Sequence, residues 1–169
     1  MSSPRVAILM GSDSDFEVMA ETVDALKEFS IPCEVHALSA HRTPHEVAEF
    51  SSNAESRGIE VFVCAAGGAA HLAGVVAAHT TLPVIGVPIN ATSLGGFDAL
   101  LSTVQMPPGI PVATVAVGKF GARNAGILAV QILARGDASL RPKLLQFKKT
   151  MAEKVKEKDR KLQEKLGGK

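Results

Sequence analysis

The sequence predicts an α/β fold in which one parallel sheet is covered by helices on both faces. Short apolar runs alternate five times with segments whose apolar residues recur at helical spacing. The third run, residues 59–66, is almost continuously apolar, as in a strand that is buried on both faces. A chain of 169 residues has the length of one typical domain. We therefore expect a single three-layer sandwich.

The first half of the chain contains three of the expected strands, at residues 5–10, 33–39 and 59–66. Helical spacing follows the first strand and ends near Phe29. A helix up to about Ser56 follows the second strand, where Thr43 can cap it and Pro44 suits its first position. A short helix over residues 72–78 follows the third strand.

The second half adds strands at residues 83–87 and 112–117, with a turn and helix at 91–101 and a helix at about 118–134. Right-handed crossovers between parallel strands place helices on both faces of the sheet. The pattern therefore indicates a flavodoxin-like, Rossmann-like sandwich with a five-stranded parallel sheet and a C-terminal helix.

A long charged helix is expected over residues 141–166, with apolar side chains along a narrow stripe. The stripe consists of Leu144, Phe147, Met151, Val155, Leu162 and Leu166. Such a helix either rests on its own domain in solvent or packs on another subunit.

The charge distribution argues against a nucleic-acid partner. The chain has 18 Lys and Arg and 17 Asp and Glu, but residues 1–140 hold 7 and 13 of them, and residues 141–169 hold 11 and 4. An acidic body is a poor surface for phosphate contacts. Aromatic residues make up 4% of the chain, without Trp or Tyr, so stacking platforms for bases are also missing. Only the basic tail keeps a nucleic-acid scaffold open as an alternative.

Neither the cysteines nor the hydropathy indicate a secreted or membrane protein. Cys33 and Cys64 lie in apolar strand-like segments without a metal-ligand or redox spacing, so we expect buried, reduced thiols. No apolar run of about 18 residues is present, and residues 1–5 carry no long apolar segment. We expect a soluble, cytoplasmic protein that does not bind membranes.

Polar residues gather in three loops that each follow a predicted strand. These loops are Gly11-Ser12-Asp13-Ser14-Asp15, Ser39-Ala40-His41-Arg42-Thr43 and Gly67-Gly68-Ala69-Ala70-His71. In open α/β sheets, ligands bind outside the carboxyl ends of the strands, where the strand order reverses. We therefore expect a ligand site where these loops meet.

The residue types in these loops suit an anionic small molecule and proton transfer. Ser12 and Ser14 open a helix, where hydroxyl and free N–H groups can either receive a phosphate or merely cap the helix. Arg42 suits a bidentate phosphate contact, or else a surface salt bridge. His41 and His71 carry imidazoles, the side chains best suited to move protons at neutral pH.

The sequence gives little support for a cofactor or a metal. Neither the dinucleotide-binding nor the P-loop glycine pattern occurs. No third ligand at a suitable spacing joins the two histidines. The stretch over residues 67–70 instead offers a wall almost free of side chains, against which a flat ligand can lie closely.

These loops resemble those of the PurE family of purine biosynthesis, and specifically its class I form, the N5-carboxyaminoimidazole ribonucleotide mutases. The resemblance covers roughly residues 5–135 and is carried by ordered motifs. They are Gly11-Ser12-x-Ser14-Asp15, Ser39-Ala40-His41-Arg42-Thr43-Pro44, Gly67-Gly68-Ala69-Ala70-His71-Leu72-x-Gly74, Pro83-Val84-x-Gly86-Val87-Pro88, Val104-Gln105-Met106-Pro107 with Pro111-Val112-Ala113-Thr114, and Asn124-Ala125. Ala73 departs from the pattern, since the family usually has proline there, and the tail after Arg141 is unusually long and basic.

The resemblance implies an isomerase that moves a carboxylate from the exocyclic nitrogen to carbon four of an imidazole ribonucleotide, without a metal or other cofactor. It implies that His41 is the general acid and base. It implies a substrate site made of Ser12, Ser14, Asp15, Ser39, Arg42, Gly68, Ala69, His71 and Leu72. It also implies a homo-octamer with sites at subunit contacts. From the sequence itself we expect a catalytic α/β domain over residues 1–140 and a charged helical extension of the same domain over 141–169.

Besides the nucleic-acid scaffold, two other functions remain open from the sequence. One is the class II reaction, in which the same fold carboxylates aminoimidazole ribonucleotide with free CO2. The other is a noncatalytic nucleotide-binding module. The choice of substrate distinguishes the class II reaction from the mutase. The effect of replacing His41 distinguishes a nucleotide-binding module from an enzyme.

Overall fold

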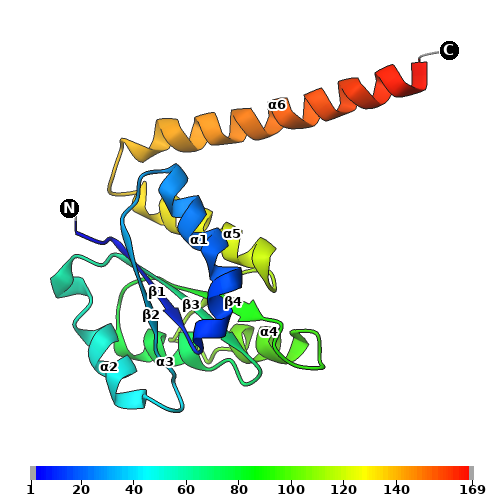
Figure 1. Ribbon diagram of the computed structural model, residues 1–169. Helices are drawn as coiled ribbons and strands as arrows, with labels where there is room; N and C mark the ends of the chain where they lie inside the picture. Colours follow the sequence, from blue (N-terminus) through cyan, green and yellow to red (C-terminus); the bar gives the residue numbers. More distant parts are fainter. Residues whose placement is uncertain (1–2, 168–169) are drawn as a thin grey trace.

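In the computed structural model, which describes residues 3–167, a single five-stranded parallel sheet forms the centre of the molecule (Figure 1). Its strands are β1 (Val6–Met10), β2 (Cys33–Ala37), β3 (Val61–Gly67), β4 (Val84–Ile89) and β5 (Ala113–Thr114). The spatial order is β2-β1-β3-β4-β5. The chain therefore adds β2 on one side of β1 and all later strands on the other, which makes the gap between β1 and β3 the switch point of the sheet.

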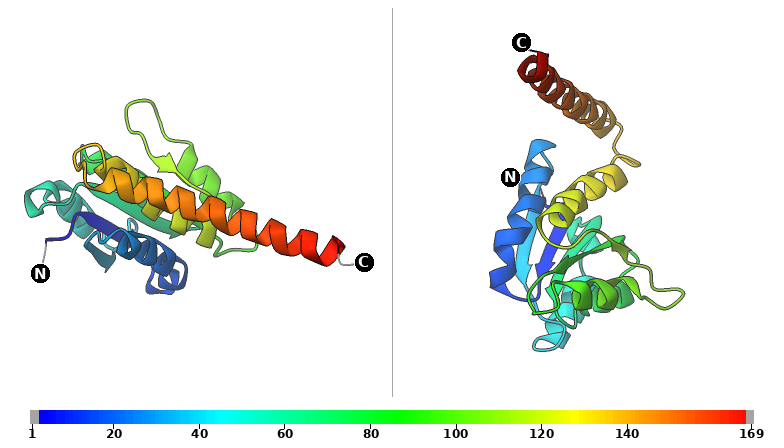
Figure 2. Two further views of the ribbon diagram at one scale, coloured as in Figure 1. Left: turned by 90° about the horizontal axis from the view of Figure 1, so that it is seen from above. Right: turned by 90° about the vertical axis from the view of Figure 1, so that its right-hand side faces the viewer.

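Helices cover both faces of this sheet, so the predicted three-layer sandwich is confirmed (Figures 1 and 2). The helices are α1 (Phe16–Glu28), α2 (Pro44–Ser52), α3 (Leu72–His79), α4 (Phe97–Val104), α5 (Lys119–Leu133) and α6 (Leu140–Gly167), with short 3-10 turns η1 (Asp13–Asp15) and η2 (Glu55–Arg57). Helices α1 and α5 pack against each other on one face, and α2, α3 and α4 lie on the other.

The alternation of side chains along the strands creates two separate cores. Ile8 and Val63 point toward α1 and α5, whereas Leu9 and Phe62 point toward α2 and α3, and all four are fully buried. Burial of a side chain of this size contributes about 1.5–3 kcal/mol. The sheet is therefore rigidly held from both sides, and its strand ends form a fixed platform.

The fifth strand is shorter than the sequence predicts. Residues 112–117 were expected to be extended, but only Ala113 and Thr114 pair with β4. Pro88 in β4 has no N–H to donate, so the ladder cannot continue regularly past this point. The chain stays alongside β4 through two single hydrogen bonds, from Val115 N to Gly86 O and from Gly118 N to Pro88 O.

Two helices also differ from their expected limits. The second helix ends at Ser52 and a separate 3-10 turn follows it, rather than one helix up to Ser56. The segment at 91–101 is a turn followed by a helix, as predicted, but α4 runs from Phe97 to Val104 and so ends three residues later than expected. Gly95 and Gly96, both with positive φ, form the end of the turn before it.

Helix α6 leaves the sandwich and projects past it (Figures 1 and 2). Its first turns pack on the domain through buried Leu140 and partly buried Leu144 and Phe147. Its outer half, from Met151 onward, is exposed throughout. No helix within residues 3–167 is long and apolar enough to span a membrane. Cys64 is buried and Cys33 half-buried, and both are free thiols.

Candidate active site

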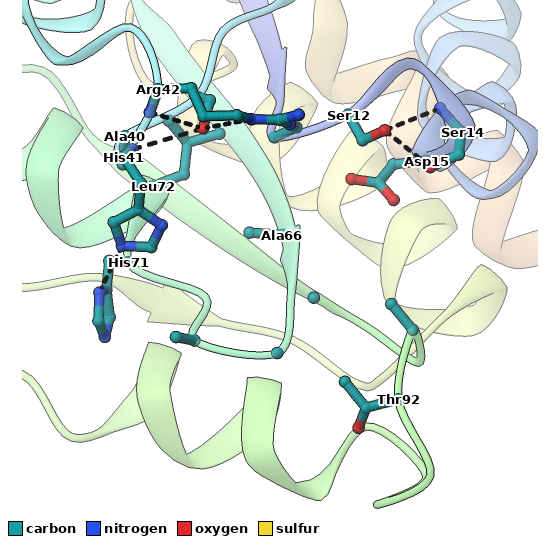
Figure 3. A pocket seen from close by; sticks show the side chains of 16 residues that line it. Ser12, Ser14, Asp15, Ala40, His41, Arg42, Ala66, His71, Leu72 and Thr92 are labelled. Carbon is teal, nitrogen blue, oxygen red and sulfur yellow. Dashed lines mark hydrogen bonds between the residues drawn. The ribbon is translucent and has the colours of Figure 1, made fainter.

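A cavity of about 480 Å³ opens at the carboxyl ends of β1, β2 and β3 (Figure 3). It lies at the switch point of the sheet, where the sequence predicts a ligand site. The loops after β1, β2, β3 and β4 all contribute to it. The lining residues are Gly11, Ser12, Ser14, Asp15, Ser39, Ala40, His41, Arg42, Ala66, Gly67, Gly68, Ala69, His71, Leu72, Ala91 and Thr92.

The loop after β1 forms a small cluster of oxygen atoms. Ser12 caps η1, and its Oγ accepts hydrogen bonds from Ser14 Oγ (2.9 Å) and Ser14 N (3.4 Å). Asp15 directly precedes α1 and is buried. Its side chain makes no capping hydrogen bond to the helix. Loss of hydration raises the pKa of the Asp15 carboxyl, an effect to which the charge of Asp13 adds and which a backbone hydrogen bond from Ser12 opposes.

The loop after β2 is tied together by Ser39 and Thr43. Thr43 occupies the cap position of α2, but its hydroxyl does not cap the helix. Instead, Thr43 Oγ1 accepts from Ser39 N (2.9 Å) and donates to Ser39 O (3.1 Å), which closes the loop on itself. Pro44 takes the first helical position, as the sequence predicts. The turn thus holds His41 and Arg42 toward the cavity.

Arg42 bridges the first two loops. Its NH2 group donates to Gly11 O at 2.7 Å, and its Nε lies 3.4 Å from Ser39 Oγ. The guanidinium is therefore fixed beside Ser12 at the cavity edge, with its remaining N–H groups free to receive an anion.

His41 and His71 face each other across the cavity wall (Figure 3). His41 Nε2 lies 2.9 Å from His71 Nδ1, and the two rings are nearly perpendicular, at 81°. One of these nitrogens must donate the proton and the other must accept it. The contact therefore fixes the orientation of an imidazole that stands at the edge of the cavity.

The floor of the cavity is backbone and small side chains. A side chain at Gly67 would place its Cβ 2.5 Å from Ala91 Cβ, so only glycine allows the loops after β3 and β4 to approach this closely. Gly68 has a φ of 61°, which glycine adopts without strain. Ala69 and Leu72 complete an apolar side that suits a flat ring.

All ten residues that the sequence analysis selected line this one cavity. The other six lining residues were not selected as site residues; they are Gly11, Ala40, Ala66, Gly67, Ala91 and Thr92. Gly11 and Ala66 contribute mainly backbone, which residue type does not reveal. Thr92 follows β4, and its position after a predicted strand end was the signal that could have identified it.

The site has no evident cation centre. Within residues 3–167, no three His, Cys, Asp or Glu side chains gather closely enough to hold a metal ion. What the arrangement offers is a carboxylate and hydroxyl groups at one end, with an arginine beside them, and an imidazole pair at the other end (Figure 3). These groups suit an elongated polar ligand with an anionic terminus and a reacting centre near the histidines.

Comparison with known proteins gives consistent matches over nearly the whole chain. A family model described as AIR carboxylase matches residues 5–154. The chain is 55% identical over 160 residues to the N5-carboxyaminoimidazole ribonucleotide mutase of Mycobacterium leprae, covering 95% of this chain and 92% of the relative. It is 52% identical over 161 residues to the protein of the same name from Pyrococcus horikoshii, covering 95% and 90%.

Solved structures agree with these matches. The crystal structure of Treponema denticola PurE superposes with a TM-score of 0.85 at 30% sequence identity, covering 94% of this chain and 98% of that one.

Proposed function

The chain belongs to the AIR carboxylase family, and on that premise we propose that it is an N5-carboxyaminoimidazole ribonucleotide mutase of purine biosynthesis that uses His41 as its general acid and base. The observation that carries this proposal is the contact between His41 Nε2 and His71 Nδ1 at the cavity edge. It holds one imidazole ready to exchange protons with a bound ligand.

Different residues of the cavity bind the phosphate, the ribose and the imidazole ring of the substrate. Arg42 and Ser12 bind the phosphate, because they place N–H and O–H donors side by side. Asp15 accepts hydrogen bonds from the ribose hydroxyls. The imidazole ring lies on the backbone of Gly68 and Ala69, with its carboxylate toward His41 and His71. Ser14, Ser39 and Leu72 complete the walls of this site.

His41 acts twice in the proposed reaction. Protonated His41 gives its proton to the exocyclic nitrogen while the bond from that nitrogen to the carboxylate breaks, which releases CO2. Carbon four of the ring then attacks the CO2 and forms a carbon–carbon bond. Neutral His41 finally removes the proton from carbon four, which restores the aromatic ring and the protonated imidazole. No net proton is taken up.

Two physical effects supply the rate. General acid and base catalysis contributes about 10²–10⁴-fold. The retention of CO2 beside the ring contributes more, because two reactants held in contact react at a far higher effective concentration than free ones. Neither effect requires a metal or a redox cofactor.

We also propose that the enzyme acts as a homo-octamer in the cytoplasm, with sites near subunit contacts. Phe97, Leu101 and Val104 are exposed at spacings of four and three residues, so they form one apolar face on α4. This face follows the loop that carries Thr92 into the cavity. Contact of another subunit with α4 would therefore shield the apolar face and steady this loop.

The class II reaction, with free CO2 and aminoimidazole ribonucleotide, is the second candidate, since the matching family model is described as AIR carboxylase. The test supplies purified protein with fresh N5-carboxyaminoimidazole ribonucleotide in one sample and with aminoimidazole ribonucleotide and bicarbonate in another. Neither sample contains ATP or added metal, and the 4-carboxy product is followed by ultraviolet absorbance. We expect efficient product formation from the first substrate only. Efficient formation from the second alone would assign the class II reaction, and no product from either would leave a nucleotide-binding module.

A further inference from the structure

Asp98 lies outside the cavity but is bound to a residue that lines it. Its carboxylate stands in the first turn of α4, where Oδ2 accepts a hydrogen bond from Thr92 Oγ1 at 2.7 Å. Thr92 lines the cavity, whereas Asp98 does not. The Thr92 oxygen also accepts a hydrogen bond from Leu94 N at 3.1 Å. The hydroxyl is therefore used as donor and acceptor within the β4–α4 loop, residues 90–96, and the start of α4.

These two hydrogen bonds decide which side of Thr92 faces the cavity. Figure 3 shows the oxygen of Thr92 turned away from the cavity and its methyl group turned toward it. A Cβ at Gly68 would lie 3.7 Å from Thr92 Cγ2, which is ordinary van der Waals contact. Thr92 therefore holds its methyl group against the Gly68 turn, on which the imidazole ring of the proposed substrate lies.

A second connection joins α4 to the same turn. Ser102 Oγ donates to Asp98 O at 2.8 Å, and the same hydroxyl lies 3.5 Å from Gly68 O. Gly68 has no side chain with which to anchor itself, and its φ of 61° places it in the left-handed region. The position of the turn therefore depends on neighbours, and the start of α4 supplies two of them, the Ser102 hydroxyl and the Thr92 methyl group.

The β4–α4 loop needs a tether of this kind. Residues 90–95 are all exposed, and Gly95 and Gly96 both have positive φ. Exposed segments with few buried apolar contacts open at a low cost in free energy. The hydrogen bond from Thr92 lowers the pKa of Asp98, so the carboxylate stays ionised at neutral pH. A charged acceptor makes the stronger hydrogen bond, which suits Asp98 to hold the loop.

We propose that Asp98 is a positioning residue for the reaction, which acts through Thr92 on the Gly68 turn and so keeps carbon four of the ring beside the released CO2. This inference rests on the function proposed above, in which CO2 leaves the exocyclic nitrogen and is recaptured by carbon four. Recapture competes with escape of CO2 from the cavity. A slight displacement of the ring slows the attack by carbon four but not the escape, so more CO2 is lost.

The fate of the carboxylate carbon tests this role. The full chain converts N5-carboxyaminoimidazole ribonucleotide, labelled with ¹³C in its carboxylate, in unlabelled bicarbonate with carbonic anhydrase. Mass spectrometry measures retention as labelled 4-carboxy product, and escape as unlabelled product or released aminoimidazole ribonucleotide. A sample without the protein corrects for uncatalysed loss. The ratio of escape to retention does not depend on the concentration of active enzyme, so a variant that is merely less stable leaves it unchanged.

Two variants remove the tether from opposite ends. Thr92→Val keeps the methyl group but lacks the hydroxyl, and Asp98→Ala lacks the acceptor. Each should raise the ratio of escape to retention about fivefold, the effect typical of one hydrogen bond. The double variant should raise the ratio no further, because both changes remove the same hydrogen bond.

Two further variants make this comparison specific. Asp98→Asn keeps an oxygen that can accept from Thr92, so its ratio should stay within about twofold of the native value. Ser93→Ala is the matched control, because Ser93 is an exposed residue of the same loop that does not line the cavity. It should leave the ratio unchanged.

Hydrogen exchange gives a second readout that does not require the reaction. Backbone amides in peptides that span residues 66–72 should exchange faster in Thr92→Val and Asp98→Ala than in the native protein or in Ser93→Ala. Mass spectrometry of the intact chain after brief labelling and digestion measures this rate. Faster exchange at these residues shows that the tether holds the Gly68 turn.

Four results would overturn the proposal. They are an unchanged ratio in Thr92→Val and Asp98→Ala, additive effects in the double variant, an equal rise in Ser93→Ala, and exchange at residues 66–72 that is the same in all variants. Absence of 4-carboxy product with the native protein would instead reject the proposed function, and the reaction role of Asp98 with it. Faster exchange would then still show that Asp98 holds the turn.

Discussion

His41 Nε2 lies 2.9 Å from His71 Nδ1, although 30 positions separate the two residues along the chain. His41 comes from the loop after β2, and His71 precedes α3 after β3. These two strands are not neighbours, because β1 lies between them. The contact therefore depends on loops that reach across the end of β1, so it requires all three strands of the switch point to be in place.

Replacement of His71 should lower turnover without preventing substrate binding. In His71→Asn we expect kcat to fall by roughly fivefold and KM to change by less than about threefold, because a hydrogen bond contributes about 1 kcal/mol and about 1.4 kcal/mol corresponds to a tenfold change in rate. Steady-state kinetics measure both constants. His45→Asn, on exposed α2 and outside the cavity, is the control and should retain both. A large rise in KM with unchanged kcat would make His71 a binding residue only.

Asp15 is expected to reduce stability while it binds substrate. Burial raises the pKa of its carboxyl above the usual 3.8, so the folded protein holds this proton to a higher pH than the unfolded chain does. The free energy of unfolding therefore falls as the pH rises from the pKa of Asp15 in the unfolded chain to its higher pKa in the folded protein. Above the folded-state pKa the loss is complete.

The variant Asp15→Asn should remove this loss. We expect its free energy of unfolding to equal or exceed that of the native protein at pH 7, with the difference shrinking as the pH falls toward about 4. Substrate affinity should fall at least about tenfold. Denaturant unfolding at several pH values and calorimetric titration measure the two effects. A variant that is less stable at neutral pH would show that the Asp15 charge stabilises the fold.

Gly121 allows α5 to begin against the preceding loop. A Cβ at this position would lie 1.6 Å from Ala116 O, which is backbone and cannot move aside cheaply. We expect Gly121→Ala to lower the free energy of unfolding by about 2 kcal/mol or more. Gly136→Ala is the control, because its Cβ would meet only Leu133 O at 3.9 Å. Equal stability of the two variants in denaturant unfolding would refute the steric account.

The sheet could be predicted from the sequence because the periodicity of apolar residues reflects which side chains are buried. The five runs that include Ile8 and Val63 became strands, and the polar loops after them met at one cavity. The positions of His41 and Arg42 followed from the rule that ligands bind at the carboxyl ends of parallel strands. Their roles came from the family resemblance rather than from the pattern.

Other features depend on contacts that a single sequence does not reveal. The short β5 results from a proline in its neighbour, not from its own composition. The contribution of Thr92 depends on the two left-handed glycines that set the length of its loop. The Thr43 hydroxyl bonds within its own loop instead of capping α2, a choice between two local partners that residue type leaves open.

The role of His41 is the central claim, and the turnover of folded His41→Asn with N5-carboxyaminoimidazole ribonucleotide tests it most directly. Asn has a similar size and polarity but cannot give a proton to the exocyclic nitrogen or remove one from carbon four. We predict native-like unfolding and substrate binding, with kcat lower by at least about 10²-fold. Turnover within tenfold of the native enzyme in a correctly folded variant would contradict this account.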